Sequence, residues 1–282
     1  MSAAVTSERH ADVERFLEAA QSWLLESEVE NNLLLGIALN RRAAEPDQAP
    51  PYWITLCDGN GIVGCACRTP PNPLVLSRAP LPAIAKLADD LSAADPALCG
   101  VTGPLAEAEA FAARWIARRG GQWKTRVCLR LHELRQLVLT AGMAAGALRK
   151  ATQSDHSLAC EWIAAYVRDA GTRPSTGDVA QRMIDRGQLY LWVVGDDDAR
   201  SMVATTRDTG SGCSINTVYT PLRFRRSGYA TAAVAALSGR LLDAGRRFCC
   251  LYTDVANPTS NSVYAKIGYR PVRDEMEIAF ER

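Results

Sequence analysis

Residues 215–230 constrain the fold more strongly than any other stretch, and they read Ile-Asn-Thr-Val-Tyr-Thr-Pro-Leu-Arg-Phe-Arg-Arg-Ser-Gly-Tyr-Ala. A β-branched and aromatic run is broken by Pro221, becomes a basic turn, and passes through Gly228 into a long alanine-rich segment. This order predicts a strand, a turn and the start of a helix. The first amides of a helix have no intrahelical acceptor and lie at the positive end of its dipole, so the position suits an anion.

The basic turn has the pattern Arg-x-x-Gly-x-Ala, which runs from Arg225 to Ala230. Gly228 and Ala230 carry almost no side chain, so a phosphate can approach the backbone closely. We therefore expect a site for a diphosphate. The alternative is a helix that begins with a solvated basic turn, and the motif alone does not separate the two interpretations.

Length and composition limit the class of protein. The 282 residues are enough for two domains, and 48% hydrophobic and 22% charged residues are typical of globular chains. A net charge of +1 gives no overall attraction to nucleic acid or to an anionic membrane. No apolar run is long enough to cross a bilayer, and the N-terminus lacks the layout of a signal peptide. We expect a cytoplasmic protein that binds neither nucleic acid nor membrane.

The nine cysteines are an odd number, and no two of them form a Cys-x-x-Cys pair. Their distribution favours small buried side chains in a reducing compartment over disulfides or metal ligands. Cys65 and Cys67 alternate within a predicted strand, so they are expected to share one face. The three histidines are not spaced as a ligand pair. The sequence therefore predicts no metal site.

Hydrophobic periodicity and turn residues predict the order of elements. In the first part we expect helix over 5–39, a hairpin of 52–57 and 62–68, a strand at 74–76, a helix from 82 to 91, a strand at 98–101, a helix over 104–119 and a strand over 123–131. In the second part we expect a strand at 147–151, helices over 156–167 and 177–185, a hairpin of 189–194 and 201–207, the strand, turn and helix described above, a strand at 247–253, a helix over 258–266 and a terminal pair of strands.

The two parts share one order of elements, which predicts an internal duplication with domains at 1–142 and 143–282. The first part has nothing like Arg-x-x-Gly-x-Ala. At the corresponding place, residues 77–82 read Ser-Arg-Ala-Pro-Leu-Pro, and the prolines lack a backbone N–H. If the first part is a duplicate, it has lost its anion site.

Residues 252–272 contain a strand end, an Asn257-Pro258 break, a short helix and an exit through Gly268. Together with the basic turn, this arrangement resembles the GNAT superfamily of acyl-CoA-dependent N-acetyltransferases. The resemblance implies an α/β fold of two tandem GNAT-like domains, each a central twisted, mostly antiparallel sheet flanked by helices. It covers residues 148–281 by motif and the first part by element order alone. The first part then looks like a degenerate copy that serves as scaffold or widens the acceptor groove.

The resemblance also implies acetyl-CoA as cofactor and assigns roles to residues. Backbone groups of Thr217, Val218 and Tyr219 would bind the pantetheine arm. The pyrophosphate would be held by Arg225, Arg226, Ser227, Gly228, Tyr229, Ala230 and Thr231. Asn257 would bind the pantetheine amides, with Ser260, Asn261 and Tyr264 completing the cofactor site. Tyr264 would also protonate the leaving thiolate.

The role of Tyr264 has an alternative, and so does the identity of the group that takes the proton from the amine. Tyr264 also fits a core aromatic on an amphipathic helix. A proton acceptor is not evident, because residues 213–219 include no carboxylate. Asp254 is a possible acceptor, and it also fits a turn residue that caps the next helix. An amine that arrives neutral through ordered water would need no base.

We therefore expect an N-acetyltransferase that moves an acetyl group directly from acetyl-CoA to the primary amine of a small molecule or protein, as a monomer or homodimer. The alternative is a non-catalytic acyl-CoA-binding regulatory module, against which Asn257 and Tyr264 together argue. A third possibility is aminoacyl transfer from tRNA. The absence of a concentrated basic patch argues against it.

Overall fold

The computed structural model describes residues 5–40, 50–138, 143–171 and 177–281. They form two compact units. The first comprises the described residues of Met1–Leu131, Thr253–Asn257 and Pro271–Arg282, and the second those of His132–Tyr252 and Pro258–Arg270. This division differs from the expected halves 1–142 and 143–282 because the last strand of the chain pairs with a strand of the first unit, Ile278 opposite Val101. Residues 139–142, beside the expected boundary, lie outside the described residues.

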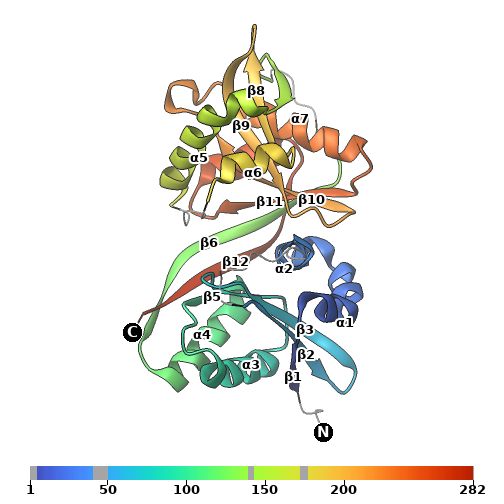
Figure 1. Ribbon diagram of the computed structural model, residues 1–282, viewed down its shortest axis with the longest axis vertical. Coiled ribbons are helices and arrows are strands. Elements are labelled where there is room, and N and C mark those ends of the chain that lie inside the picture. Colours follow the sequence, from blue (N-terminus) through green and yellow to red (C-terminus); the bar gives the residue numbers. More distant parts are fainter. Residues whose placement is uncertain (1–4, 41–49, 139–142, 172–176, 282) are drawn as a thin grey trace. The chain divides into compact units, whose positions relative to one another are not determined.

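The first unit is a mixed sheet with two pairs of helices (Figure 1). Its elements are β1 (Thr6–His10), α1 (Val13–Glu26), α2 (Glu28–Asn40), β2 (Tyr52–Asp58), β3 (Gly61–Arg68), β4 (Leu74–Leu76), α3 (Leu81–Ala94), β5 (Gly100–Pro104), α4 (Leu105–Arg119), most of β6 (Gln122–Leu134) and most of β12 (Arg270–Glu281). The strand order is β1-β2-β3-β4-β5-β12-β6. Only β4 and β5 are parallel among the pairs resolved between β1 and β12.

Alternating side chains of this sheet are buried on its two faces. Trp53, Cys65 and Cys67 pack with α1 and α2 in one core cluster. Ile54 and Leu56 pack with α3 and α4 in another. Cys65 and Cys67 therefore share a face, as the sequence predicts.

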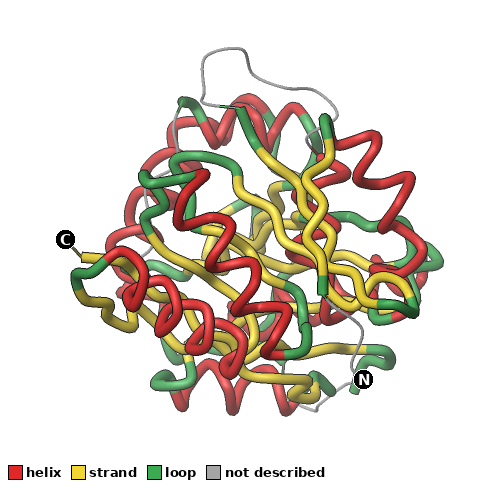
Figure 2. The backbone as a smooth tube through the Cα atoms, turned by 90° about the horizontal axis from the view of Figure 1, so that it is seen from below, coloured by secondary structure: helices red, strands yellow, loops and turns green. Residues whose placement is uncertain are grey.

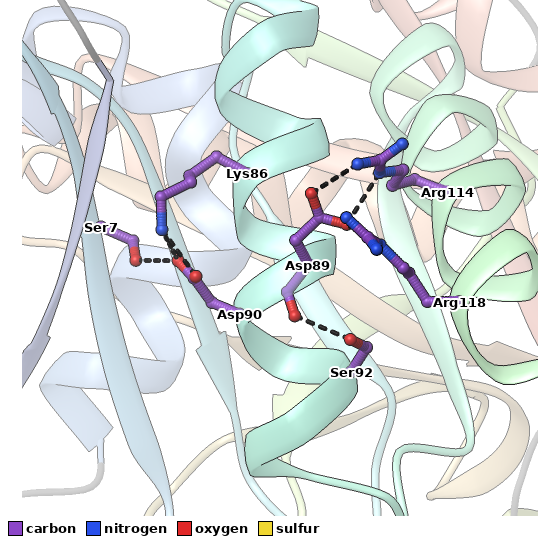
Figure 3. Close-up of polar contacts among 7 residues, drawn as sticks. All are labelled: Ser7, Lys86, Asp89, Asp90, Ser92, Arg114 and Arg118. Carbon is purple, nitrogen blue, oxygen red and sulfur yellow. Dashed lines mark hydrogen bonds and ion pairs between the residues drawn. The ribbon is translucent and has the colours of Figure 1, made fainter.

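Charged side chains tie α3 to its neighbours (Figure 3). Both carboxylate oxygens of Asp89 accept hydrogen bonds from Arg114 of α4 at 2.7 Å. Arg118, one turn further along α4, donates to the same carboxylate at 2.6 Å. On the next residue of α3, Asp90 accepts from Lys86 at 2.6 Å. The bonds of Asp89 join α3 to α4, whereas the bond between Lys86 and Asp90 lies within α3.

The second unit also has helices packed against both faces of a mostly antiparallel sheet. Figure 2 shows the helices of the chain in red and its strands in yellow. Its elements are β7 (Ala147–Lys150), the 3-10 helix η1 (Gln153–Asp155), α5 (His156–Ala170), α6 (Val179–Asp185), β8 (Leu189–Val194), β9 (Asp198–Thr206), β10 (Gly212–Tyr219), the 3-10 helix η2 (Leu222–Phe224), α7 (Tyr229–Asp243), β11 (Phe248–Asp254) and α8 (Pro258–Lys266). The strand order is β11-β10-β9-β8-β7, and β10 and β11 are parallel.

The two faces of this second sheet have separate cores. Trp192, Val203 and Ile215 pack with α7 and α8. Leu191 and Met202, one residue away on the same strands, pack with α5 and α6. Successive side chains of each strand therefore pack on opposite faces of the sheet. As a result, α7 and α5 lie on opposite sides of β10.

Most predicted elements are present, with three differences, the first being that the helix expected over 5–39 is two helices, α1 and α2. Residues 6–10 form β1, antiparallel to β2, and helix begins only at Val13 because Asp12 caps it by accepting from the Arg15 amide at 2.8 Å. The expected terminal pair of strands is one long strand, β12. In the described part of the chain, no helix has the length and apolarity needed to span a bilayer.

Candidate functional site

The parallel strands β10 and β11 pair only over their first residues. Their register runs from Gly212 opposite Phe248 to Ser214 opposite Cys250. β10 continues to Tyr219, and among the described residues no further pair joins it to β11. Residues 215–219 therefore have backbone groups without a ladder partner on β11, which an extended ligand can bind as an added strand.

A β-bulge lies in the same stretch of β10. Asn216 is opposite Ala204 and Tyr219 is opposite Met202, so Thr217 and Val218 together face a single residue of β9. Thr217 has a φ of 52° and donates its amide to the side-chain oxygen of Asn216 at 2.6 Å. A left-handed threonine costs about 1–3 kcal/mol, which the surrounding structure must offset. The bulge re-aims the backbone of the residues predicted to bind pantetheine.

The turn after β10 leads into the N-terminus of α7. Gly228 is the N-cap with a φ of 79°, and no side chain caps the helix. The first helical bond runs from the amide of Ala232 to the carbonyl of Gly228 at 3.0 Å. The amides of Tyr229, Ala230 and Thr231 precede it, so they have no acceptor within the helix. A left-handed glycine followed by such amides is a backbone arrangement that can bind an anion.

The arginines of the turn differ in their surroundings. Arg225 pairs with Asp169 of α5 and donates to the carbonyl of Thr220 at 2.9 Å, so part of its charge is already offset. Arg226 is exposed and has a left-handed backbone, with φ 64°. Ser227 is exposed as well. Beside the α7 amides, the positive charge of Arg226 is therefore less offset by a carboxylate than that of Arg225.

Tyr264 of α8 lies in the core of the second unit. Its side chain is 9% exposed, and its ring meets that of Tyr269 edge to face at 6.0 Å between centroids. Burial raises the pKa of Tyr264 well above its usual value, and the nearby phenol of Tyr166 raises it further. The residue therefore packs as a core aromatic, and its hydroxyl stays protonated at neutral pH.

Tyr166 and Asn216 meet at the bulge of β10, and the sequence analysis singled out neither. The Tyr166 hydroxyl, on α5, donates to the Asn216 side-chain oxygen at 3.2 Å. Burial raises the pKa of Tyr166, and the charge of Arg207 lowers it. Tyr166 lies in a helical run that reads as ordinary core packing, so the sequence holds no signal for its role. In the described contacts of Tyr166, Asn216 and Tyr264, no carboxylate takes part.

The remaining predicted residues follow β11. Asp254 and Asn257 are exposed and cluster with the first unit. A carboxylate oxygen of Asp254 accepts from the Ala256 amide at 2.8 Å, and its carbonyl accepts from the Asn257 amide at 3.0 Å. Asp254 thus makes the contacts of a turn residue. Asn261 is half-buried and has a polar partner, whereas the side chain of Ser260 lies outside the described residues.

The corresponding place in the first unit is built differently. Pro80 is the N-cap of α3, and its carbonyl accepts from both Ala83 and Ile84 at 2.8 and 3.2 Å. The Ala79 amide donates to the buried Glu107 carboxylate at 3.4 Å. Pro80 and Pro82 contribute no N–H. These contacts leave few amides for an anion at this place.

The first unit instead has a polar cavity of about 580 Å³ near the start of α3. Glu26, Glu30 and Glu107 line it, together with Arg78. Glu30 is also paired with Arg273 at 3.1 Å. Glu30 is thus compensated by Arg273, and Glu107 accepts the Ala79 amide, so Glu26 and Arg78 are the remaining charged groups of the lining.

The buried cysteines are poor nucleophiles. Burial, together with neighbouring thiols, raises the pKa of Cys249 to about 12. Burial and Asp208 raise that of Cys213 to about 12. A thiolate at either position is disfavoured at neutral pH, which argues against a covalent acyl intermediate there. Cys160 differs from the prediction, because it is exposed.

The chain matches one sequence family over part of its length and resembles several solved structures in fold. Residues 194–278 match the family described as FR47-like protein. A GCN5-related N-acetyltransferase from Sphaerobacter thermophilus is similar with a TM-score of 0.62 and 13% identity, over 98% of this chain and 95% of that chain. A tandem GNAT protein from the clavulanic acid biosynthesis pathway is similar with a TM-score of 0.58 and 12% identity, over 99% and 98%. A GNAT-family acetyltransferase from Colwellia psychrerythraea has a TM-score of 0.58 and 11% identity, over 98% and 100%. No curated protein matches the sequence.

Proposed function

Because this chain has the two-domain fold of the GNAT superfamily, we propose that its second unit transfers an acetyl group from acetyl-CoA to a primary amine. The observation that carries the proposal is the combination of three features in one unit: the divergence of β10 from β11, the bulge at Thr217, and the uncapped N-terminus of α7. The proposed location is the cytoplasm, as the sequence predicts.

The residues present fit this cofactor. The amides of Gly228, Tyr229, Ala230 and Thr231 would hold the pyrophosphate, with Arg226 adding charge. Backbone groups of residues 217–219 would bind the pantetheine arm like an added strand. Asn257 and Asn261 are proposed as further pantetheine contacts. When bound, acetyl-CoA supplies the acetyl group as an activated thioester.

Tyr264 is the proposed general acid. Its phenol is protonated at neutral pH, as a general acid must be, and the burial that raises its pKa makes it a weaker acid than an exposed tyrosine. Tyr166 is proposed to position Asn216, and through it the amide of Thr217. We propose that the amine enters neutral or gives its proton to water, with Asp254 as the alternative acceptor.

We propose that the first unit serves as scaffold or contributes to acceptor binding. The support for this role is its α3 N-terminus, where Pro80 replaces free amides, and its polar cavity. The proposed acceptor is the amine of a small molecule or of a protein.

A second candidate is a regulatory module that binds acyl-CoA without turnover. The core packing of Tyr264 favours it. The two candidates share cofactor binding and differ in the release of the thiol.

The experiment is a thiol-release assay with acetyl-CoA and a panel of primary amines, using the full chain. The proposed enzyme releases thiol with at least one amine, and Tyr264→Phe lowers kcat by about ten- to a thousandfold while acetyl-CoA affinity stays within about twofold. Tyr190→Phe, a half-buried tyrosine of β8, is the control. Thiol release by no amine, alongside tight acetyl-CoA binding, would establish the regulatory module instead.

A further inference from the structure

Three potential metal ligands meet on the surface of the second unit. The His156 imidazole and the Cys160 thiol belong to α5, and the Asp178 carboxylate precedes α6. One ligand atom from each lies within 4.8 Å of the other two. The Nε2 atom of His156 is 2.7 Å from Oδ2 of Asp178 and 3.6 Å from Sγ of Cys160.

The local structure explains why these side chains converge. His156 and Cys160 are four residues apart on one helix, so they lie one above the other on the same face. Asp178 is the N-cap of α6, and its Oδ1 atom accepts from the Gln181 amide at 2.9 Å. That bond holds the carboxylate in place and leaves Oδ2 directed at the imidazole. The first turns of α5 and the N-cap of α6 thus bring one nitrogen, one sulfur and one oxygen atom together.

The spacing is close to that of a tetrahedral zinc centre. Zinc bonds of about 2.3 Å to sulfur and about 2.0 Å to nitrogen place those two ligands about 3.6 Å apart. The distance from Cys160 to His156 already has this value. The distance from His156 to Asp178 would open from the present hydrogen bond to about 3.3 Å. A small rotation of one exposed carboxylate supplies that change.

A proton relay does not explain the cluster. In a Cys-His-Asp relay, one ring nitrogen faces the thiol and the other faces the carboxylate. Here the same Nε2 atom of His156 faces both Cys160 and Asp178. Convergence on one point is the arrangement of ligands around an ion.

We propose that His156, Cys160 and Asp178 bind a divalent cation that prefers mixed nitrogen, sulfur and oxygen ligands, with Zn²⁺ as the favoured ion. Water completes the fourth position, because Cys160 and Asp178 are exposed. The ion joins the N-terminal turn of α5 to the N-cap of α6 and stabilises the second unit. This site goes beyond the transferase proposal and does not depend on it. The sequence predicts no metal because its histidines are not paired and Cys160 reads as buried.

The test is a titration of the full chain, freed of metal and kept reduced, with Zn²⁺ by calorimetry and with Co²⁺ by absorption spectroscopy. One equivalent of Zn²⁺ is expected, and the Co²⁺ complex is expected to show a thiolate charge-transfer band. Cys160→Ser should abolish the band, and His156→Gln should weaken Zn²⁺ binding at least tenfold. Asp178→Asn should do the same while keeping an oxygen to cap α6. Cys57→Ser and His10→Gln are controls that should retain both signals.

Thermal unfolding provides a second readout that does not depend on activity. Zn²⁺ should raise the Tm of the unaltered protein and of the two control variants, because an ion that binds only the folded state stabilises it. It should leave the Tm of Cys160→Ser unchanged, and the metal-free Tm shows whether that variant folds. Absence of Zn²⁺ binding by the unaltered chain overturns the proposal. So does an equivalent of Zn²⁺ that Cys160→Ser retains with unchanged affinity.

Discussion

The hydroxyl of Tyr166 donates a hydrogen bond to the side-chain oxygen of Asn216, 3.2 Å away, at the bulge of β10. The same oxygen accepts the amide of Thr217 at 2.6 Å. One side chain of α5 therefore helps to hold a left-handed residue of the strand that we propose to bind pantetheine. The hydrogen bond between Tyr166 and Asn216 thus couples the position of α5 to the conformation of the bulge in β10.

Tyr166→Phe should disturb this geometry without touching the acetyl group. Loss of a half-buried hydrogen bond costs about 0.5–1.5 kcal/mol, so acetyl-CoA affinity should fall about two- to tenfold. Because Tyr166 acts through Asn216, KM for acetyl-CoA should rise more than kcat falls. Steady-state kinetics with a responsive amine and calorimetry measure the two effects. A fall in kcat at constant KM would contradict the positioning role and make Tyr166 a candidate acid.

Arg226→Ala should weaken acetyl-CoA binding more than Arg225→Ala. Arg225 shares its charge with Asp169, whereas Arg226 is exposed beside the α7 amides. A charge-assisted contact is worth about 1.5 kcal/mol or more, which corresponds to about tenfold in affinity. The loss should shrink at high salt, since ions screen exposed charges. Calorimetry at two salt concentrations measures both variants, and a larger loss for Arg225→Ala would show that we assigned the wrong arginine.

The acid sensitivity of the second unit should depend on Arg149. This arginine donates to both oxygens of the Asp155 carboxylate at 2.8 and 2.9 Å, and its hydrogen bonds lower the pKa of Asp155 to about 2 from 3.8. A depressed folded-state pKa stabilises the protein above pH 3.8, and that contribution is lost as the pH falls toward 2.

Arg149→Met should therefore lower the Tm at pH 5 and flatten the further loss between pH 4 and about pH 2. Arg15→Met, which removes an exposed pair with Glu18 in the first unit, is the control and should keep the original pH dependence. Thermal unfolding followed by circular dichroism between pH 5 and pH 2 tests this. An unchanged acid slope in Arg149→Met would show that the ion pair does not set it.

Much of this fold could be predicted because its elements carry strong local signals. The hairpin turns, the glycine that ends α4 at Gly120, and the switch from strand to helix around Gly228 all depend on neighbouring residues. Strand β1 could not be predicted from the sequence, because the residues Thr6–His10 are polar and mostly exposed. They form a strand only by pairing with β2. The return of β12 to the first unit is also a long-range pairing that no local pattern encodes.

The residues of the candidate site are likewise of two kinds, those that a local motif predicts and those that only long-range packing brings together. Gly228 and the residues of its turn form one continuous motif, so sequence alone could find them. Tyr166 is brought to Asn216 by the packing of α5 on β10, and its helical period is that of any core residue. The convergence of Cys160 and Asp178 depends likewise on how α6 follows α5. Contacts between distant elements are where the sequence provides no signal.

The N-terminus of α7 is the proposed binding site for the pyrophosphate of acetyl-CoA. Gly228→Glu places a negative side chain at the proposed pyrophosphate position and strains a residue with a φ of 79°. Gly245→Glu introduces the same charge at a glycine with a φ of 93° and open space around it, beyond the other end of α7. Calorimetry with acetyl-CoA should show binding by the unaltered chain and by Gly245→Glu, and no binding by a folded Gly228→Glu. Equal affinity of the two variants would show that acetyl-CoA does not bind at the N-terminus of α7.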